Sequence, residues 1–166
     1  MAVSAQEPSD FFASLNKIIQ AAPDNFSAIR GEEIKKDLGP FSAYANPEFQ
    51  SMEKLEGALS CIITQDMSKQ WSFNARFGSF ADVESAGKLF KKLEAKLRSH
   101  NNYPFGSARF SSRGDALGTF FYVEPAKASE NQKRVNLTLS QLKGLERGDS
   151  GKLEEKYQVT LTVRYN

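Results

Sequence analysis

Two stretches of the chain repeat apolar residues at the three- and four-residue spacing of an amphipathic helix. In the first, Phe12, Leu15 and Ile19 follow Ser9, a favourable N-cap. Pro23 ends this helix, because proline disfavours helical backbone in the residue before it. The second stripe has lysines on its flanks and consists of Val83, Ala86, Leu89 (with Phe90), Leu93 and Leu97. Each helix should bury one face against the rest of the protein.

Between these helices, alternation of apolar and polar residues predicts two strands. The segment 55–64 places Leu59, Cys61 and Ile63 on one face, and the segment 71–77 alternates large apolar residues with small polar ones. The polar stretch 65–70 reverses the chain between them. We therefore expect an antiparallel hairpin, with a short extended segment at 26–29 before it.

The second half of the chain is rich in strand signals. Alternation predicts strands around 108–110, 119–123 and 135–139, separated by turns that include 144–151. The last segment, 157–165, alternates without a breaker and is rich in β-branched residues. A long exposed edge of this kind would invite aggregation, so we expect a central strand or an edge that a second copy covers.

This order of elements favours an α+β fold, because the strands cluster in hairpins and do not alternate with helices. We expect an antiparallel sheet of about six to eight strands with two amphipathic helices packed on one face. Residues 1–8 form a disordered N-terminal segment in this prediction, and residues 9–166 form a single domain.

Composition excludes several classes of function. The 166 residues include 22 basic and 20 acidic side chains, a net charge of +2 that does not predict nucleic acid or a membrane surface as the partner. No apolar run reaches the ~18 residues of a membrane span. With one cysteine and one histidine, the chain has no internal disulfide and no Cys/His metal site. We accordingly expect no metal and no cofactor.

The N-terminus leaves the cellular location open. The segment 1–8 has neither the basic nor the apolar part of a signal peptide. Residues 3–5, Val-Ser-Ala, nevertheless match the small-x-small pattern that precedes a signal-peptidase cut. Export to the periplasm or the extracellular space and retention in the cytoplasm are both consistent with this sequence.

Three short motifs suggest chemistry but have simpler explanations. The Arg-Gly-Asp sequences at 113–115 and 147–149 resemble adhesive motifs, but Gly followed by Asp is typical of tight turns. Cys61 and His100 could form a nucleophile and base. We expect a buried, unreactive Cys61 instead, because it shares a strand face with Leu59 and Ile63.

Aromatic residues provide the remaining candidates, since 13 phenylalanines are many for this length. They could line an apolar pocket between the sheet and the helices, or they could fill the core. The pocket candidates are Trp71, Phe73, Phe77, Phe110, Phe120 and Tyr122.

No catalytic constellation accompanies the long β-rich half of the chain. We therefore expect a non-enzymatic binding or interaction domain that takes an unknown protein partner or a small apolar ligand, with a homodimer as one arrangement. The alternative is a small enzyme or apolar-ligand carrier that uses the aromatic pocket.

Overall fold

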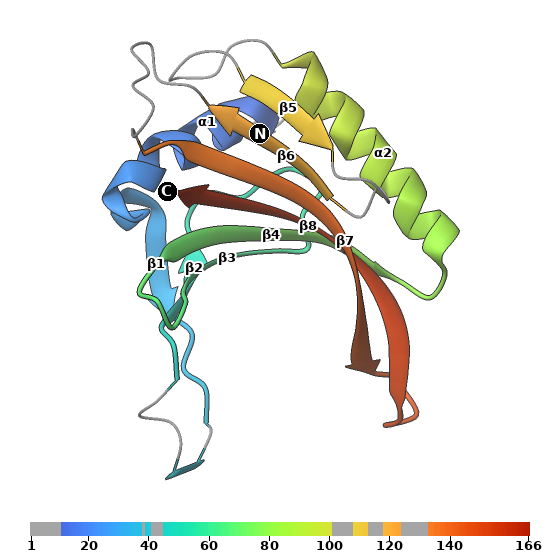
Figure 1. Ribbon diagram of the computed structural model, residues 1–166. Helices are drawn as coiled ribbons and strands as arrows, with labels where there is room; N and C mark the ends of the chain where they lie inside the picture. Colours follow the sequence, from blue (N-terminus) through green and yellow to red (C-terminus); the bar gives the residue numbers. More distant parts are fainter. Residues whose placement is uncertain (1–10, 38, 41–44, 101–107, 113–117, 124–132) are drawn as a thin grey trace, which may run out of the picture.

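A computed structural model describes residues 11–37, 39–40, 45–100, 108–112, 118–123 and 133–166, and of 108–112 only the backbone. The predicted segment 1–8, the Arg-Gly-Asp motif at 113–115 and the loop after the second helix lie outside these ranges. The described chain contains two α-helices, two short 3-10 helices and one sheet of eight strands (Figure 1).

The strands follow the sequence order β1 (Arg30–Glu33), β2 (Glu48–Ser51), β3 (Ser60–Gln65), β4 (Trp71–Phe80), β5 (Ala108–Ser112), β6 (Gly118–Val123), β7 (Val135–Arg147) and β8 (Leu153–Tyr165). In space their order is β1-β2-β3-β4-β8-β7-β6-β5, and every neighbouring pair is antiparallel. The predicted α+β class with an antiparallel sheet is confirmed. The predicted β3–β4 hairpin is confirmed as well.

β8 lies at the centre of the sheet, between β4 and β7. Its register pairs Leu161 with Ala75 on one side and with Leu139 on the other. The expectation of a central C-terminal strand is therefore confirmed. This position joins the first half of the chain to the second, because β8 closes a sheet whose two halves are built from separate sequence segments.

The helices α1 (Phe11–Ala21) and α2 (Val83–Ser99) cover one face of this sheet (Figure 1). The Phe11 ring of α1 lies 6.4 Å from the Phe77 ring of β4. On α2, the carboxylate of Glu94 accepts a hydrogen bond from the buried Thr119 of β6. The two helices also meet each other, since the Lys96 ammonium lies 4.4 Å from the centre of the Phe11 ring.

The core fills the space between this helix-covered face and the helices. Large side chains from every part of the chain meet there with less than 2% of their surface exposed; they include Phe11, Leu15, Ile18, Ile19, Phe26, Ile63, Phe73, Leu97, Phe121, Leu137, Leu139 and Leu161. Burial of each such side chain stabilises the fold by roughly 1.5–3 kcal/mol. No helix of the described residues covers the opposite face of the sheet, called the open face below.

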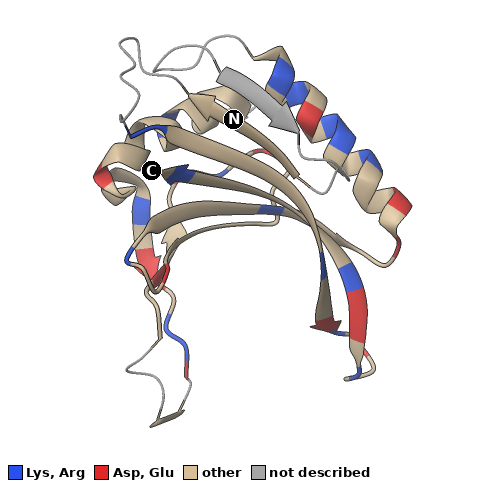
Figure 2. Cartoon of the chain, viewed as in Figure 1, with Lys and Arg blue, Asp and Glu red and all other residues tan. Residues whose placement is uncertain are grey.

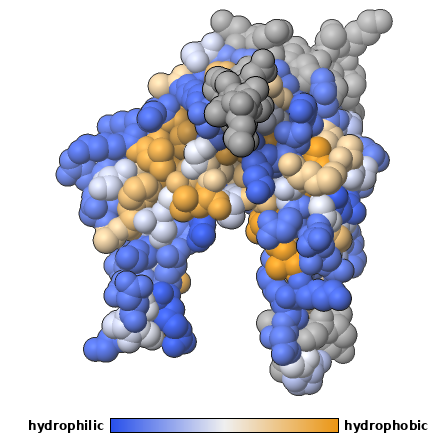
Figure 3. Space-filling model, turned by 180° about the vertical axis from the view of Figure 1, so that it is seen from behind, coloured by the Kyte–Doolittle hydropathy of each residue, from blue (hydrophilic) through white to orange (hydrophobic). Residues whose placement is uncertain are grey.

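Two segments project from the body of the protein beyond the sheet (Figure 1). One is the far half of the β7–β8 hairpin, where β7 continues to Arg147 after β6 has ended opposite Ser140. The other includes the described residues 34–37 and 45–47 between β1 and β2. Seen from behind, the two projections leave a hollow between them (Figure 3).

The structure corrects four local predictions. Ser27–Ile29 is a 3-10 helix and not a strand, because Phe26 adopts a left-handed φ of 60° and turns the chain. No strand was predicted directly after residue 29, yet β1 begins at Arg30 and its pairing with β2 extends to Glu33. The first half of the predicted turn 144–151 is strand, because β7 stays paired with β8 as far as Arg147 opposite Leu153.

The fourth correction concerns which side chains are buried. Leu59 is 66% exposed because β3 starts only at Ser60, so Leu59 does not share the buried face of Cys61. On α2, Val83 is 55% exposed at the first turn of the helix, where it extends past the sheet, and Phe90 is buried instead.

Candidate functional site

The open face carries rows of polar side chains that run across the strands. Directly opposite residues of antiparallel strands point to the same face. One row therefore joins Asn74, Thr162 and Thr138 across β4, β8 and β7. The next row joins Ser72, Arg164 and Asn136 across the same strands. The centre of the open face thus presents hydroxyl and amide groups.

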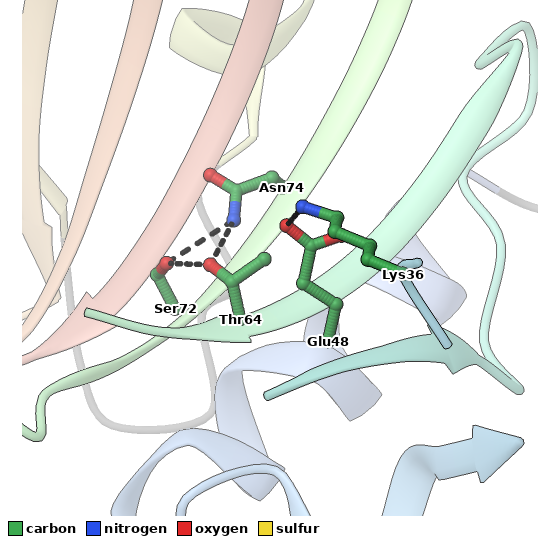
Figure 4. A network of polar contacts seen from close by, with 5 residues as sticks. All are labelled: Lys36, Glu48, Thr64, Ser72 and Asn74. Atoms are coloured by element: carbon green, nitrogen blue, oxygen red, sulfur yellow. Dashed lines mark hydrogen bonds and ion pairs between the residues drawn. The ribbon is translucent and has the colours of Figure 1, made fainter. Parts of the chain in front are cut away.

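Half of this polar surface is occupied by its own hydrogen bonds (Figure 4). The amide of Asn74 donates to the hydroxyl of Thr64 at 3.2 Å and to that of Ser72 at 3.1 Å. The hydroxyl of Thr162 donates to the Asn74 carbonyl oxygen at 3.0 Å. At the border of this network, Lys36 and Glu48 form an ion pair at 2.5 Å. These groups hold one another in fixed positions and have little capacity left for a ligand.

The other half of the open face contains a pocket of about 350 Å³, called the Arg164 pocket below. Its floor and walls come from β6, β7 and β8, and its lining residues are Phe120, Phe121, Tyr122, Asn136, Leu137, Thr138, Arg164 and Asn166. Phe121 and Leu137 have their side chains in the core and contribute backbone here. The side chains that a ligand would meet are therefore aromatic, amide, hydroxyl and guanidinium groups.

Three polar side chains of the Arg164 pocket are free to bind a ligand, whereas the side-chain oxygen of Asn166 accepts a hydrogen bond from the Gln70 amide. Within the described residues, the side chains of Asn136, Thr138 and Arg164 form no hydrogen bond or ion pair. By contrast, the guanidinium of Arg76, farther along this face, is paired with Glu146 at 3.7 Å. Arg164 is thus the exposed cation of the central open face that keeps its full donor capacity.

A second pocket, of about 480 Å³, lies at the same end of the sheet. It is called the Trp71 pocket below, and it is lined by Ala22, Pro23, Asn25, Ser68, Lys69, Gln70, Trp71, Lys133, Tyr165 and Asn166. Asn166 borders both pockets. The ammonium of Lys133 lies 5.9 Å from the centre of the Tyr165 ring, a cation–π contact that leaves its hydrogen-bond donors free.

Several basic side chains lie at this end of the sheet. Figure 2 shows basic residues at the end of β8 and beside the start of β7, next to the C-terminus. The nearest carboxylate at the β3–β4 turn, Asp66, accepts hydrogen bonds from Ser68 and from the Gln70 backbone. These bonds, with a smaller contribution from the charge of Arg164, hold the pKa of Asp66 below its usual range. Asp66 is therefore ionised at neutral pH, and its Oδ1 accepts all three of these hydrogen bonds from its own turn.

The aromatic residues singled out from the sequence divide among three places. Phe73 and Phe77 are buried in the core on the helix-covered face. Phe120 and Tyr122 line the Arg164 pocket on the opposite face, and Trp71 lines the Trp71 pocket. Phe110 pairs with Phe121 in the register of β5 and β6, and its side chain lies outside the described part of the structure. The five described side chains thus do not surround one common cavity.

The contacts of Cys61 and His100 indicate structural roles for both residues. Cys61 is buried, and burial raises the pKa of its thiol. His100 caps the C-terminus of α2 and stacks on Phe12 with 4.1 Å between ring centres. Its Nε2 lies 3.4 Å from Oδ1 of the Asn16 side chain. At the Arg-Gly-Asp motif of residues 147–149, the Arg147 guanidinium donates a hydrogen bond to the Gly151 backbone carbonyl across the β7–β8 turn, as expected of turn chemistry.

Searches for other kinds of site gave negative results. Among the described residues, no group of three or more His, Cys, Asp or Glu side chains is arranged to hold a metal ion. None of the described helices is long and apolar enough to cross a membrane. Comparisons with protein-family models, with curated proteins and with solved structures found no match. The two pockets are therefore the features of the described structure that point to a function.

Sequence reasoning missed the polar half of the Arg164 pocket. Asn136, Thr138 and Arg164 occupy the polar positions of alternating strands, which is where solvent-facing residues are expected. The available signal was that the polar positions of both 136–140 and 160–164 are filled by Asn, Thr, Ser and Arg, with no Lys or Glu. Only the strand order shows that these two sets are neighbours.

Proposed function

We propose that this protein is a non-enzymatic binding domain that holds its ligand on the open face of the sheet, in the Arg164 pocket. The observation that carries this proposal is the contrast between two halves of one polar surface. Around Asn74 the polar groups bond to one another, whereas Asn136, Thr138 and Arg164 form no such bonds among the described residues. A pocket with a few convergent polar groups and an aromatic wall is the usual form of a ligand site.

The packing of the helix-covered face does not favour an apolar-ligand carrier. Phe73 and Phe121 have at most 1% of their surface exposed, and they fill the region where such a ligand would lie between sheet and helices. Close packing of this kind leaves few voids larger than a water molecule. The open face is the better candidate for binding.

Fragment mapping by NMR tests this proposal. The labelled full chain is titrated with a fixed set of fragments, namely acetate, glucose, glucuronate, phenol, a neutral dipeptide and a nucleoside monophosphate. We expect the shifted backbone amides to cluster in 118–123, 136–140 and 160–166. Shifts that cluster on α1 or α2, or an absence of shifts with every fragment, would contradict the proposal. The variant Lys92→Ala, on an exposed position of α2, serves as the control for nonspecific effects of charge.

A further inference from the structure

The ligand of the Arg164 pocket must be recognised by side chains. β6, β7 and β8 each have a hydrogen-bonded neighbour on both sides at this point, so their backbone groups are already paired. Peptides that bind to sheets usually add a strand at an unpaired edge. The pocket lies on a face and offers no such edge, which argues against an extended peptide.

The neutral groups of the pocket match a sugar ring. Asn136 offers two amide donors and an acceptor, and Thr138 offers a hydroxyl that both donates and accepts. Phe120 and Tyr122 supply apolar ring surface beside these groups. A sugar presents the complementary arrangement, with hydroxyls at the rim of the ring and C–H groups on its faces.

Arg164 adds a requirement for negative charge. A guanidinium binds a carboxylate through two parallel hydrogen bonds, which fixes the orientation as well as the position of the anion. Since Arg164 has no such partner among the described residues, the ligand is expected to supply the carboxylate. This combination of groups is found in a uronic acid, a sugar that carries a carboxylate on its ring.

The neighbouring Trp71 pocket extends the same chemistry. A chain that leaves the Arg164 pocket past Asn166 meets Lys133 and Lys69, and neither lysine is ion-paired within the described residues. Trp71 and Tyr165 line this pocket from the helix-covered side of the sheet end, where both rings also pack against the core, and the Arg30 guanidinium lies 4.0 Å from the centre of the Trp71 ring. A nucleic acid would require neutralisation of many more phosphates than these three cations allow. A polymer with spaced carboxylates suits them better.

We infer that the Arg164 pocket and the adjoining Trp71 pocket bind an acidic polysaccharide, with one uronic acid carboxylate on Arg164 and a further carboxylate near Lys133 and Lys69. This inference rests on the proposed function, because it names the ligand class of the same site. Binding involves no covalent step.

Calorimetric titration of the full chain at about 0.15 M salt, where long-range charge effects are largely screened, tests this inference. The probes are a short oligogalacturonate, the same oligomer with its carboxylates methyl-esterified, polyglutamate and oligothymidylate. Four proteins are compared: the wild type, Arg164→Ala, Arg164→Lys and Lys92→Ala. The control Lys92→Ala removes one exposed positive charge far from the site, and thermal melts establish that all four are folded.

We expect the oligogalacturonate to bind about tenfold more weakly to Arg164→Ala than to the wild type, as expected for loss of a hydrogen bond to a charged group. Arg164→Lys should fall between them, and Lys92→Ala should bind like the wild type. The methyl ester should bind the wild type about tenfold more weakly than the acid, with little further loss in Arg164→Ala.

Three results would overturn the inference. Equal affinity of the wild type for the acid and its methyl ester would show that the protein does not recognise the carboxylate. Binding of a neutral sugar on the open face would still support the proposed function. If polyglutamate or oligothymidylate bound as tightly as the oligogalacturonate or more tightly, the protein would not be selective for the sugar ring. If no saccharide bound, the inference would fail, and the fragment shifts described above would decide separately whether the open face is a binding surface.

Discussion

The hydroxyl of Ser79 on β4 donates a hydrogen bond of 2.8 Å to the carboxylate of Glu146, which lies in the projecting half of β7. Glu146 also accepts a hydrogen bond from Gln158 of β8, whose cross-strand partner in the hairpin is Leu142. Glu146 is four residues beyond Leu142 on β7, a distance of ~13 Å along an extended strand. The hairpin must therefore bend toward the open face for the side chains of Gln158 and Glu146 to meet. The Glu146 carboxylate thus helps to set the curvature that forms one wall of the hollow in Figure 3.

This role predicts a pH-dependent contribution of Glu146 to stability. The hydrogen bonds from Ser79 and Gln158, with a smaller effect of the Arg76 charge, lower the pKa of Glu146 in the folded protein. A lowered pKa stabilises the fold above the unfolded value of about 4.3, and this stabilisation is lost as pH falls through the folded pKa. Glu146→Gln should therefore be less stable than the wild type at pH 7, and the difference should shrink in acid.

Urea unfolding of both proteins at neutral pH and at about pH 3 checks this prediction, because the lower value lies below the usual Glu pKa. Glu155→Gln, which removes a carboxylate from the same hairpin but breaks only the surface pair with Lys143, is the matched control. A stability difference between Glu146→Gln and the wild type that did not change with pH would contradict the assignment.

The buried face of α2 should dominate the contribution of that helix to stability. Leu93 is 6% exposed and faces the sheet, whereas the neighbouring Lys92 is exposed. Leu93→Ala should lower the free energy of unfolding by ~2–5 kcal/mol, because it leaves a cavity in the core. Lys92→Ala should change it by less than ~0.5 kcal/mol. Equal effects of the two substitutions in urea melts would mean that the face assigned to the core is wrong.

The thiol of Cys61 should be unreactive in the folded protein. Its side chain is buried, and this burial raises the thiol pKa, so the reactive thiolate is scarce at neutral pH. We expect a thiol reagent to label the native protein at the rate of its unfolding and the urea-unfolded protein rapidly. Fast labelling under native conditions would contradict the buried position.

Removal of residues 159–166 should prevent folding. This segment holds the central part of β8, where Val159, Leu161 and Val163 are almost fully buried between β4 and β7. Without it, both neighbouring strands would expose unpaired backbone and apolar side chains. The truncated chain should be insoluble or lack a cooperative thermal transition by circular dichroism. A soluble product that melts cooperatively would show that β8 is dispensable.

Helix α2 and strand β8 could be predicted from the sequence because their patterns are long. Along α2 the apolar spacing predicts the burial of Leu93 and Leu97, which the structure confirms. Along β8 the alternation of apolar and polar residues is uninterrupted. A central position was predicted for this strand because a long exposed edge strand would promote aggregation. Periodicity and the avoidance of unpaired edges are both local arguments, so one sequence is sufficient for them.

The Arg164 pocket could not be predicted in the same way. Phe120 and Tyr122 were candidates for their aromatic character, but their partners Thr138 and Asn136 come from the next strand and Arg164 from the one beyond. Register and strand order bring these residues together, and neither is encoded in the spacing along the chain. Phe73 and Phe77 were candidates of the same type, and only the packing of the helices shows that they belong to the core.

The most direct test of the open face as the binding surface is to block its pocket with a large side chain. Thr138 lines the Arg164 pocket and is half-buried, so Thr138→Trp would place a large side chain in the pocket from an accessible position. Lys92→Trp places the same side chain on the exposed side of α2. With both variants folded by thermal melting, we expect Thr138→Trp to abolish the fragment-induced NMR shifts in 118–123 and 160–166, and Lys92→Trp to retain them. Unchanged fragment binding by Thr138→Trp would contradict a binding site on the open face.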